Sequence, residues 1–164
     1  MEYEAKVEGT VITITIPVIF AKGTTEEQKE LFVKGAKMWE GEYGDYSVVM
    51  NVEERDNGKR NKIKFSEKNA DDNHVSYVFA SKYMKLFNEI DEDRNLWVIS
   101  HEVGHLMELD DQYVELKKVE GKKRTEVKEG WEDNIMAERW GKPDSRNIGE
   151  VVKKPKTEEG EKSE

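Results

Sequence analysis

The segment Val11–Ile16 has a β-branched residue at every position, and it constrains the fold more than any other run in the chain. Val, Ile and Thr restrict χ1 and favour extended backbone, so the run predicts a β-strand that can extend to Phe20. A helix should follow at once, because Thr24 or Thr25 is a suitable N-cap and Thr24 with Glu27 fits a capping box. A strand that leads directly into a helix is typical of folds that mix the two kinds of element.

The remaining elements follow from alternating apolar residues, turn signals and helix caps. The first helix should end near Trp39, ahead of Gly41 and Gly44. We further expect strands over Tyr46–Val52, Lys62–Phe65 and His74–Ala80, a long helix from Asp91 or Asp93 to Leu109, a hairpin over Val114–Lys128, and a last helix that begins at Asp144 or Ser145. This order predicts an α+β fold, in which one helix backs a mixed, twisted sheet and the long helix carries the candidate active site.

The length of 164 residues fits one domain. Charged residues make up 38% of the chain and hydrophobic residues 35%, which predicts a modest core under a strongly ionic surface. We place the single domain at residues 1–152. From Lys153 to Glu164 the chain is dominated by Lys, Glu, Gly and Ser, so residues 153–164 are expected to form a disordered, charged tail.

Composition also excludes several classes of function. A formal net charge of −9 argues against nucleic acid as a partner, since phosphate binding relies on clustered Lys and Arg. The absence of cysteine excludes disulfides and thiol catalysis. The chain shows no basic–apolar leader and no run of about 18 apolar residues, so we expect a soluble chain without a membrane partner. The compartment stays open, and secretion or delivery by a leaderless route is compatible with these features.

The motif His101-Glu102-Val103-Gly104-His105 is the strongest functional signal, and it uses two of the three histidines. On a helix, residues four apart lie on the same face, so both imidazoles can reach one metal ion. Glu102 then lies beside them, where it can contact a metal-bound water without displacing it. The third histidine, His74, falls in a polar segment and is expected to be exposed. Ser100 has no accompanying base and orienting group, which excludes a serine triad.

A catalytic zinc ion takes three protein ligands and one water, so a third ligand is required. Glu108 shares a face with His101 and His105 but lies about 10 Å along the helix axis from His101, at ~1.5 Å per residue. Asp111 can reach the ion only if the helix ends near Glu108 and the chain turns back. From the residues alone, both Glu108 and Asp111 remain candidates.

The tract from His101 to Tyr113 reads H-E-V-G-H-L-M-E-L-D-D-Q-Y. It resembles the metzincin signature H-E-x-x-H-x-x-G-x-x-H/D, and most closely the snapalysin-like branch and bacterial toxin metallopeptidases, with H-E-x-G-H-x-x-G-L-P-D-x-Y. The segment Asn134-Ile135-Met136-Ala137 looks like the methionine turn of that family. Two residues depart from the pattern: Glu108 replaces a glycine, at a cost of about 1–2 kcal/mol if φ is positive, and Asp110 replaces a proline.

The resemblance implies a zincin-like fold with a small C-terminal part that contains the Met-turn. It implies Zn²⁺ held by His101, His105 and Asp111, and Glu102 as the general base that activates a zinc-bound water. Tyr113 is a further catalytic candidate, and with Arg139 a candidate to stabilise the oxyanion. The implied function is that of a zinc-dependent endopeptidase acting on peptides or proteins, and by analogy a bacterial toxin or effector.

Two points remain open at this stage. An inhibitor or immunity protein is a further partner to consider for such an enzyme. The alternative function is a catalytically inactive zincin-like binding module, which the replacement of glycine by Glu108 favours. Substrate and cleavage preference are not visible in the sequence.

Overall fold

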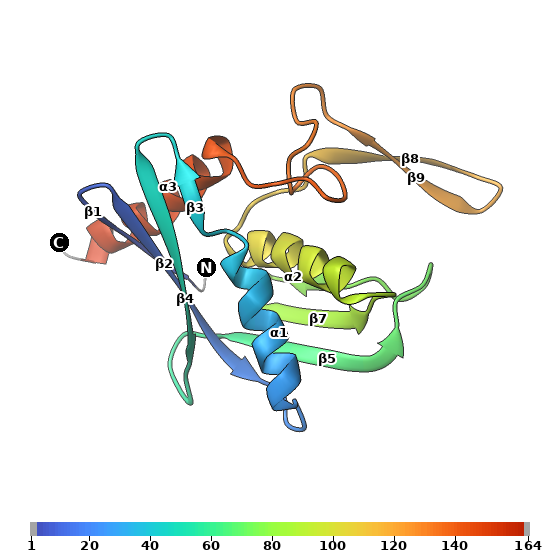
Figure 1. Ribbon diagram of the computed structural model, residues 1–164, viewed down its shortest axis with the longest axis horizontal. Helices are drawn as coiled ribbons and strands as arrows, with labels where there is room; N and C mark the ends of the chain where they lie inside the picture. The colour runs from blue at the N-terminus through green and yellow to red at the C-terminus, as the bar shows by residue number, and fades with distance from the viewer. Residues whose placement is uncertain (1–2, 163–164) are drawn as a thin grey trace.

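Figure 1 shows the computed structural model of the protein, in which α1 and α2 pack beside one another on a mixed sheet. The structure describes residues 3–162, and within them residues 122, 123 and 154–162 are described by their backbone alone. The strands are β1 (Glu4–Glu8), β2 (Val11–Phe20), β3 (Gly41–Tyr43), β4 (Tyr46–Glu54), β5 (Asn61–Asn69), β6 (Tyr77–Phe79), β7 (Tyr83–Asn88), β8 (Tyr113–Val119) and β9 (Lys122–Val127). The helices are α1 (Glu26–Lys37), α2 (Glu92–Leu106) and α3 (Ser145–Lys162).

The main sheet has the strand order β3-β4-β2-β5-β7-β6. β2 runs parallel to β4 and β5, and β5 runs parallel to β7, whereas β3 and β6 pair antiparallel at the two ends. β1 pairs antiparallel with Val11–Thr15, and β5 pairs with Val18–Phe20 farther along β2. The sheet is therefore mixed, as predicted, and β6 is an edge strand.

The core combines buried residues of the main sheet with buried residues of α1, α2 and the first turns of α3. Alternation along β2 buries Ile12, Ile14 and Ile16, the period expected of a strand with one covered face. Gly35 of α1 faces α2 so closely that a Cβ there would overlap the side chain of Ile99. A small residue at this crossing lets the two helices approach, and this contact fixes the position of the helix that carries the histidine motif.

The predicted elements are confirmed in type, with corrections in detail. β2 reaches Phe20, Asp91 is the N-cap of α2, and β8 and β9 form the expected hairpin. The capping box of α1 was assigned wrongly: Thr25 with Gln28 forms it, and the hydroxyl of Thr24 bonds to a backbone carbonyl instead. The strands β1, β3 and β7 were not predicted, and α2 ends before Leu109.

Helix α3 packs against β1, and the hydroxyl of Tyr3 donates to the carbonyl of Val151 at 2.7 Å. Its bounds reach Lys162 and thus include most of residues 153–164, for which we expected disorder. The side chains from Lys154 onward lie outside the described residues, so the disordered tail stays a prediction. Within the part of the chain that the structure describes, no helix is both long and apolar enough to cross a membrane.

Candidate metal centre

The two histidines of the motif lie on one face of α2, and each is oriented by a backbone carbonyl. Nδ1 of His101 lies 2.8 Å from the carbonyl oxygen of Ile135, and Nδ1 of His105 lies 2.8 Å from that of Leu109. A carbonyl oxygen only accepts hydrogen bonds, so each Nδ1 carries the proton. In the neutral rings Nε2 then has a lone pair, which is the state that binds a metal ion.

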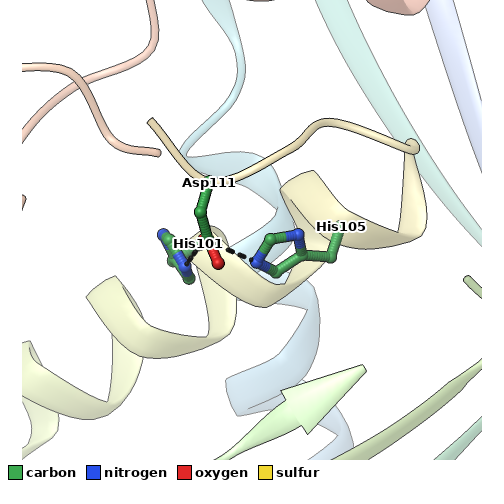
Figure 2. A group of neighbouring side chains, drawn as sticks. All are labelled: His101, His105 and Asp111. Atoms are coloured by element: carbon green, nitrogen blue, oxygen red, sulfur yellow. Dashed lines mark ion pairs between the residues drawn. The ribbon is translucent and has the colours of Figure 1, made fainter. Parts of the chain in front are cut away.

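Asp111 completes a three-residue cluster with the histidines (Figure 2). Its Oδ1 lies 3.2 Å from Nε2 of His101 and 3.0 Å from Nε2 of His105. Bonds of about 2.0–2.1 Å at tetrahedral angles would separate two ligand atoms by about 3.3 Å, close to these distances. Glu108, the other candidate third ligand, is not part of the cluster.

The cluster has the electrostatic character of a cation site. Oδ1 of Asp111 is buried and receives no hydrogen bond from the described residues. Two nitrogen lone pairs and a carboxylate oxygen gathered within 4.8 Å repel one another unless a positive charge lies between them. His101, His105 and Asp111 can therefore hold a metal ion.

The pKa shifts in the cluster have the same cause. Burial alone would raise the pKa of Asp111, but the two imidazoles beside its carboxylate outweigh burial and hold this pKa well below its usual range. Burial alone would lower the pKa of His105, but the Asp111 and Glu102 carboxylates raise it instead. Both directions mean that the cluster favours an added positive charge, from a proton or from a metal ion.

The end of α2 explains how Asp111 reaches the histidines. Glu108 adopts a φ of 60°, and the amide of Leu109 donates to the carbonyl of Gly104 at 3.0 Å. The amide of Glu108 donates to the carbonyl of His105 at 3.0 Å, which completes a Schellman motif. The chain thus leaves the helix in the way that the sequence resemblance predicts, although a glutamate and not a glycine occupies the left-handed position.

The predicted methionine turn lies beneath the cluster and connects its parts. The turn supplies the carbonyl of Ile135 to His101, and the carbonyl of Met136 accepts a hydrogen bond of 2.7 Å from the amide of Gln112. Asn134 holds the turn in shape, because the amide of Met136 donates to its side-chain oxygen at 2.9 Å. One buried turn therefore orients a histidine on α2 and the chain segment that carries Asp111.

Glu102 is 7% exposed and lines the same cleft as the two histidines. Burial raises the pKa of Glu102 to about 7, although the charges of His101 and His105 act in the opposite direction. A carboxyl group with a pKa near neutrality can both accept and return a proton at physiological pH.

The cluster opens into a cleft of about 1100 Å³. The segment that leads into β6 borders it, and the base of the β8–β9 hairpin, which projects from the body in Figure 1, borders it elsewhere. Tyr113 and Arg139, the two candidates to stabilise an oxyanion, both line the cleft. Burial, and next the charge of Asp111, raise the pKa of Tyr113, so its phenol is neutral at physiological pH.

His74, expected to be exposed, is partly covered: it pairs with Asp71 at 2.8 Å and also lines the cleft.

Sequence reasoning missed one side chain that shapes the site. Trp97 stacks on the ring of His101 with centroids 5.2 Å apart and donates from Nε1 to the carbonyl of Gly141. Its position four residues before His101, one turn earlier on the same helix face, is the signal that could have revealed it.

Comparisons with known proteins add no information about the site. The chain matches no protein-family model, and no match was found among curated proteins or among solved structures.

Proposed function

We propose that the protein is a zinc-dependent endopeptidase of metzincin type, with His101, His105 and Asp111 as the zinc ligands. The observation that carries this proposal is the convergence of two Nε2 atoms and one carboxylate oxygen at the floor of an open cleft. Two nitrogens and one oxygen suit zinc. Three protein ligands leave a fourth position for water, which is typical of catalytic zinc sites and not of structural ones.

Glu102 makes hydrolysis the best-supported reaction. When bound, zinc supplies Lewis acidity, which polarises a peptide carbonyl and lowers the pKa of water. Glu102 takes a proton from the water whose oxygen bonds to the carbonyl carbon. It returns this proton to the nitrogen as the C–N bond breaks, so the products are a carboxylate and an amine. The burial of Glu102 beside the two histidines supports this role.

The fold supports a zincin-like architecture and suggests how a peptide would bind. The outer edge of β6 has no partner strand among the described residues, and β6 contributes Tyr77 and Val78 to the cleft. An extended peptide can add to such an edge through main-chain hydrogen bonds. Tyr113 and Arg139 then remain the candidates to stabilise the oxyanion.

The inactive binding module was favoured by Glu108, because a helix that did not end there would keep Asp111 away. The positive φ of Glu108 ends the helix there, and this supports the enzymatic function over the binding module. Action as a toxin or effector, and control by an inhibitor or immunity protein, stay predictions from the sequence resemblance.

One experiment tests the proposal. Zinc content and cleavage of an unfolded protein substrate are measured for the parent chain, Glu102→Gln and His105→Ala. We expect about one zinc per chain in the parent and in Glu102→Gln, activity in the parent, and a loss of about 10²–10⁴-fold in Glu102→Gln. His105→Ala should lose both zinc and activity. A parent chain that binds zinc and cleaves nothing would instead indicate the binding module.

A further inference from the structure

We infer that the polypeptides accepted by this cleft are cationic, with Lys or Arg side chains near the scissile bond. The inference rests on the proposed function, because it names the substrate class of the same site. Acidic side chains line the cleft, and they come from two segments that are distant in the sequence.

The cleft is strongly acidic. Its lining includes nine carboxylate side chains and two arginines, an excess of seven negative groups. A bound divalent cation would reduce the excess only to five. One of the two arginines, Arg94, is paired with Glu89 at 3.0 Å. The other arginine of the lining is Arg139.

The acidic residues lie in two separate parts of the cleft. Asp71 and Asp72 belong to the loop that precedes β6, while Asp110, Glu115 and Glu138 come from the segments that follow α2. Asp72, Asp110 and Glu115 are exposed, and none of them forms a salt bridge within the described part of the chain. Their charge is therefore available to a ligand. A cleft lined by one sign of charge concentrates the field and attracts ligands of the opposite sign.

Two independent observations point to a polypeptide as the ligand. Glu102 is nine-tenths buried, lines the cleft and receives no hydrogen bond from the described residues, so a polar group faces the space that a substrate would fill. The edge of β6 offers main-chain groups beside it. Side chains of a peptide paired with β6 would alternate in direction, and those directed into the cleft would meet the carboxylates.

The β8–β9 hairpin provides a matched pair of residues for the test. Glu115 is paired with Thr125 and lies on the hairpin face that also contains Tyr113 and Val127, and all four residues line the cleft. Glu126 is paired with Val114 on the opposite face and is not part of the lining. Glu115→Lys and Glu126→Lys therefore make the same change in net charge on the same hairpin, but only the first changes the cleft.

The test measures binding in the zinc-loaded Glu102→Gln protein, in which bound peptide should persist. Two short extended peptides of equal length are compared by fluorescence anisotropy, one alternating Lys with Ser and the other Glu with Ser. We expect the Lys peptide to bind about tenfold or more tightly at low salt, with the preference reduced at high salt. Glu115→Lys should weaken binding of the Lys peptide several-fold, and Glu126→Lys should leave it nearly unchanged.

Equal affinity for the two peptides would overturn the inference, because the cleft would then show no preference for cationic ligands. Equal weakening by Glu115→Lys and Glu126→Lys would also overturn it, because net charge alone would then explain binding. Cleavage by the parent chain is measured separately, and a parent that cleaves neither peptide contradicts the proposed function while leaving the binding preference in place. A parent that cleaves the Glu peptide as fast as the Lys peptide would overturn the inference while leaving the peptidase in place.

Discussion

Met136 packs against Gly104 so closely that a Cβ on Gly104 would lie 2.5 Å from the Met136 sulfur. Such a Cβ would also lie 3.1 Å from Cζ2 of Trp39, so it would meet neighbours on two sides. The glycine inside the histidine motif is thus required by the methionine turn beneath it, and the two sequence features that suggested a metallopeptidase are one packing unit.

We predict that Gly104→Ala lowers the free energy of unfolding by about 1–3 kcal/mol, because it overpacks this contact. Gly149→Ala is the matched control: Gly149 also lies in a helix, but a Cβ there would have no neighbour within 4 Å. The control should raise stability by about 0.5–1 kcal/mol through helix propensity. Urea denaturation of both variants checks the prediction, and an equal response of the two would show that Gly104 has room.

A second prediction concerns the left-handed residue at the end of α2. Glu108→Gly should be more stable than Glu108→Ala by about 1 kcal/mol, because only glycine adopts a φ of 60° without strain. Both variants remove the glutamate side chain, so their difference isolates the backbone effect. Thermal or urea denaturation measures it. If the alanine variant were as stable as the glycine variant, the helix would end in some other way.

The third prediction concerns the proposed third zinc ligand. Zinc added to chelator-treated protein should stabilise the parent by about 4 kcal/mol when its concentration is about 1,000 times Kd. Asp111→Ala should lose most of this gain, since its carboxylate joins both histidines. Asp110→Ala and Glu108→Ala should keep it, because neither residue belongs to the cluster. If Glu108→Ala lost the stabilisation by zinc and Asp111→Ala kept it, our proposal would be wrong and Glu108 would be the third ligand. Calorimetric titration with zinc provides the check.

The fourth prediction is a pH dependence of the chelator-treated protein. Burial raises the pKa of Glu102 from its ordinary value of 4.5 to about 7, so between these values the folded state binds more protons than the unfolded state. Stability should therefore fall as the pH rises from about 4.5 to 7. Glu102→Gln removes this contribution, and its stability should fall less over the same range. If the stability of the parent and of Glu102→Gln changed with pH in parallel, the raised pKa of Glu102 would be contradicted.

Much of the site could be predicted because it depends on local spacing. The histidines of α2 are four residues apart, and helix geometry alone brings His101 and His105 together. The turn at Met136 and the position of Asp111 came from the sequence resemblance. What the sequence did not reveal are the carbonyls of Ile135 and Leu109, because every residue has such a group and only the folded chain shows which one faces a ring.

In the fold, too, features set by local sequence were predicted and features that depend on distant neighbours were not. The strand at Val11–Ile16 was predicted because its β-branched run favours extended backbone over helix, and β2 extends to Phe20. The short strands β1 and β3 depend on their neighbours for pairing, and their own residues carry no strong strand signal. Thr24 and Thr25 were nearly equivalent as caps, and the choice of Thr25 depends on which hydroxyl reaches the amide of Gln28. The acidic cleft could not be predicted either, because its carboxylates come from loops far apart in the sequence.

The β8–β9 hairpin meets the cleft only near its base, and its two strands make most of their contacts with each other. We expect changes toward its tip to leave His101, His105 and Asp111, and the turn beneath them, in place. The hairpin is therefore a suitable place to graft new recognition loops, while the residues on α2 stay as they are.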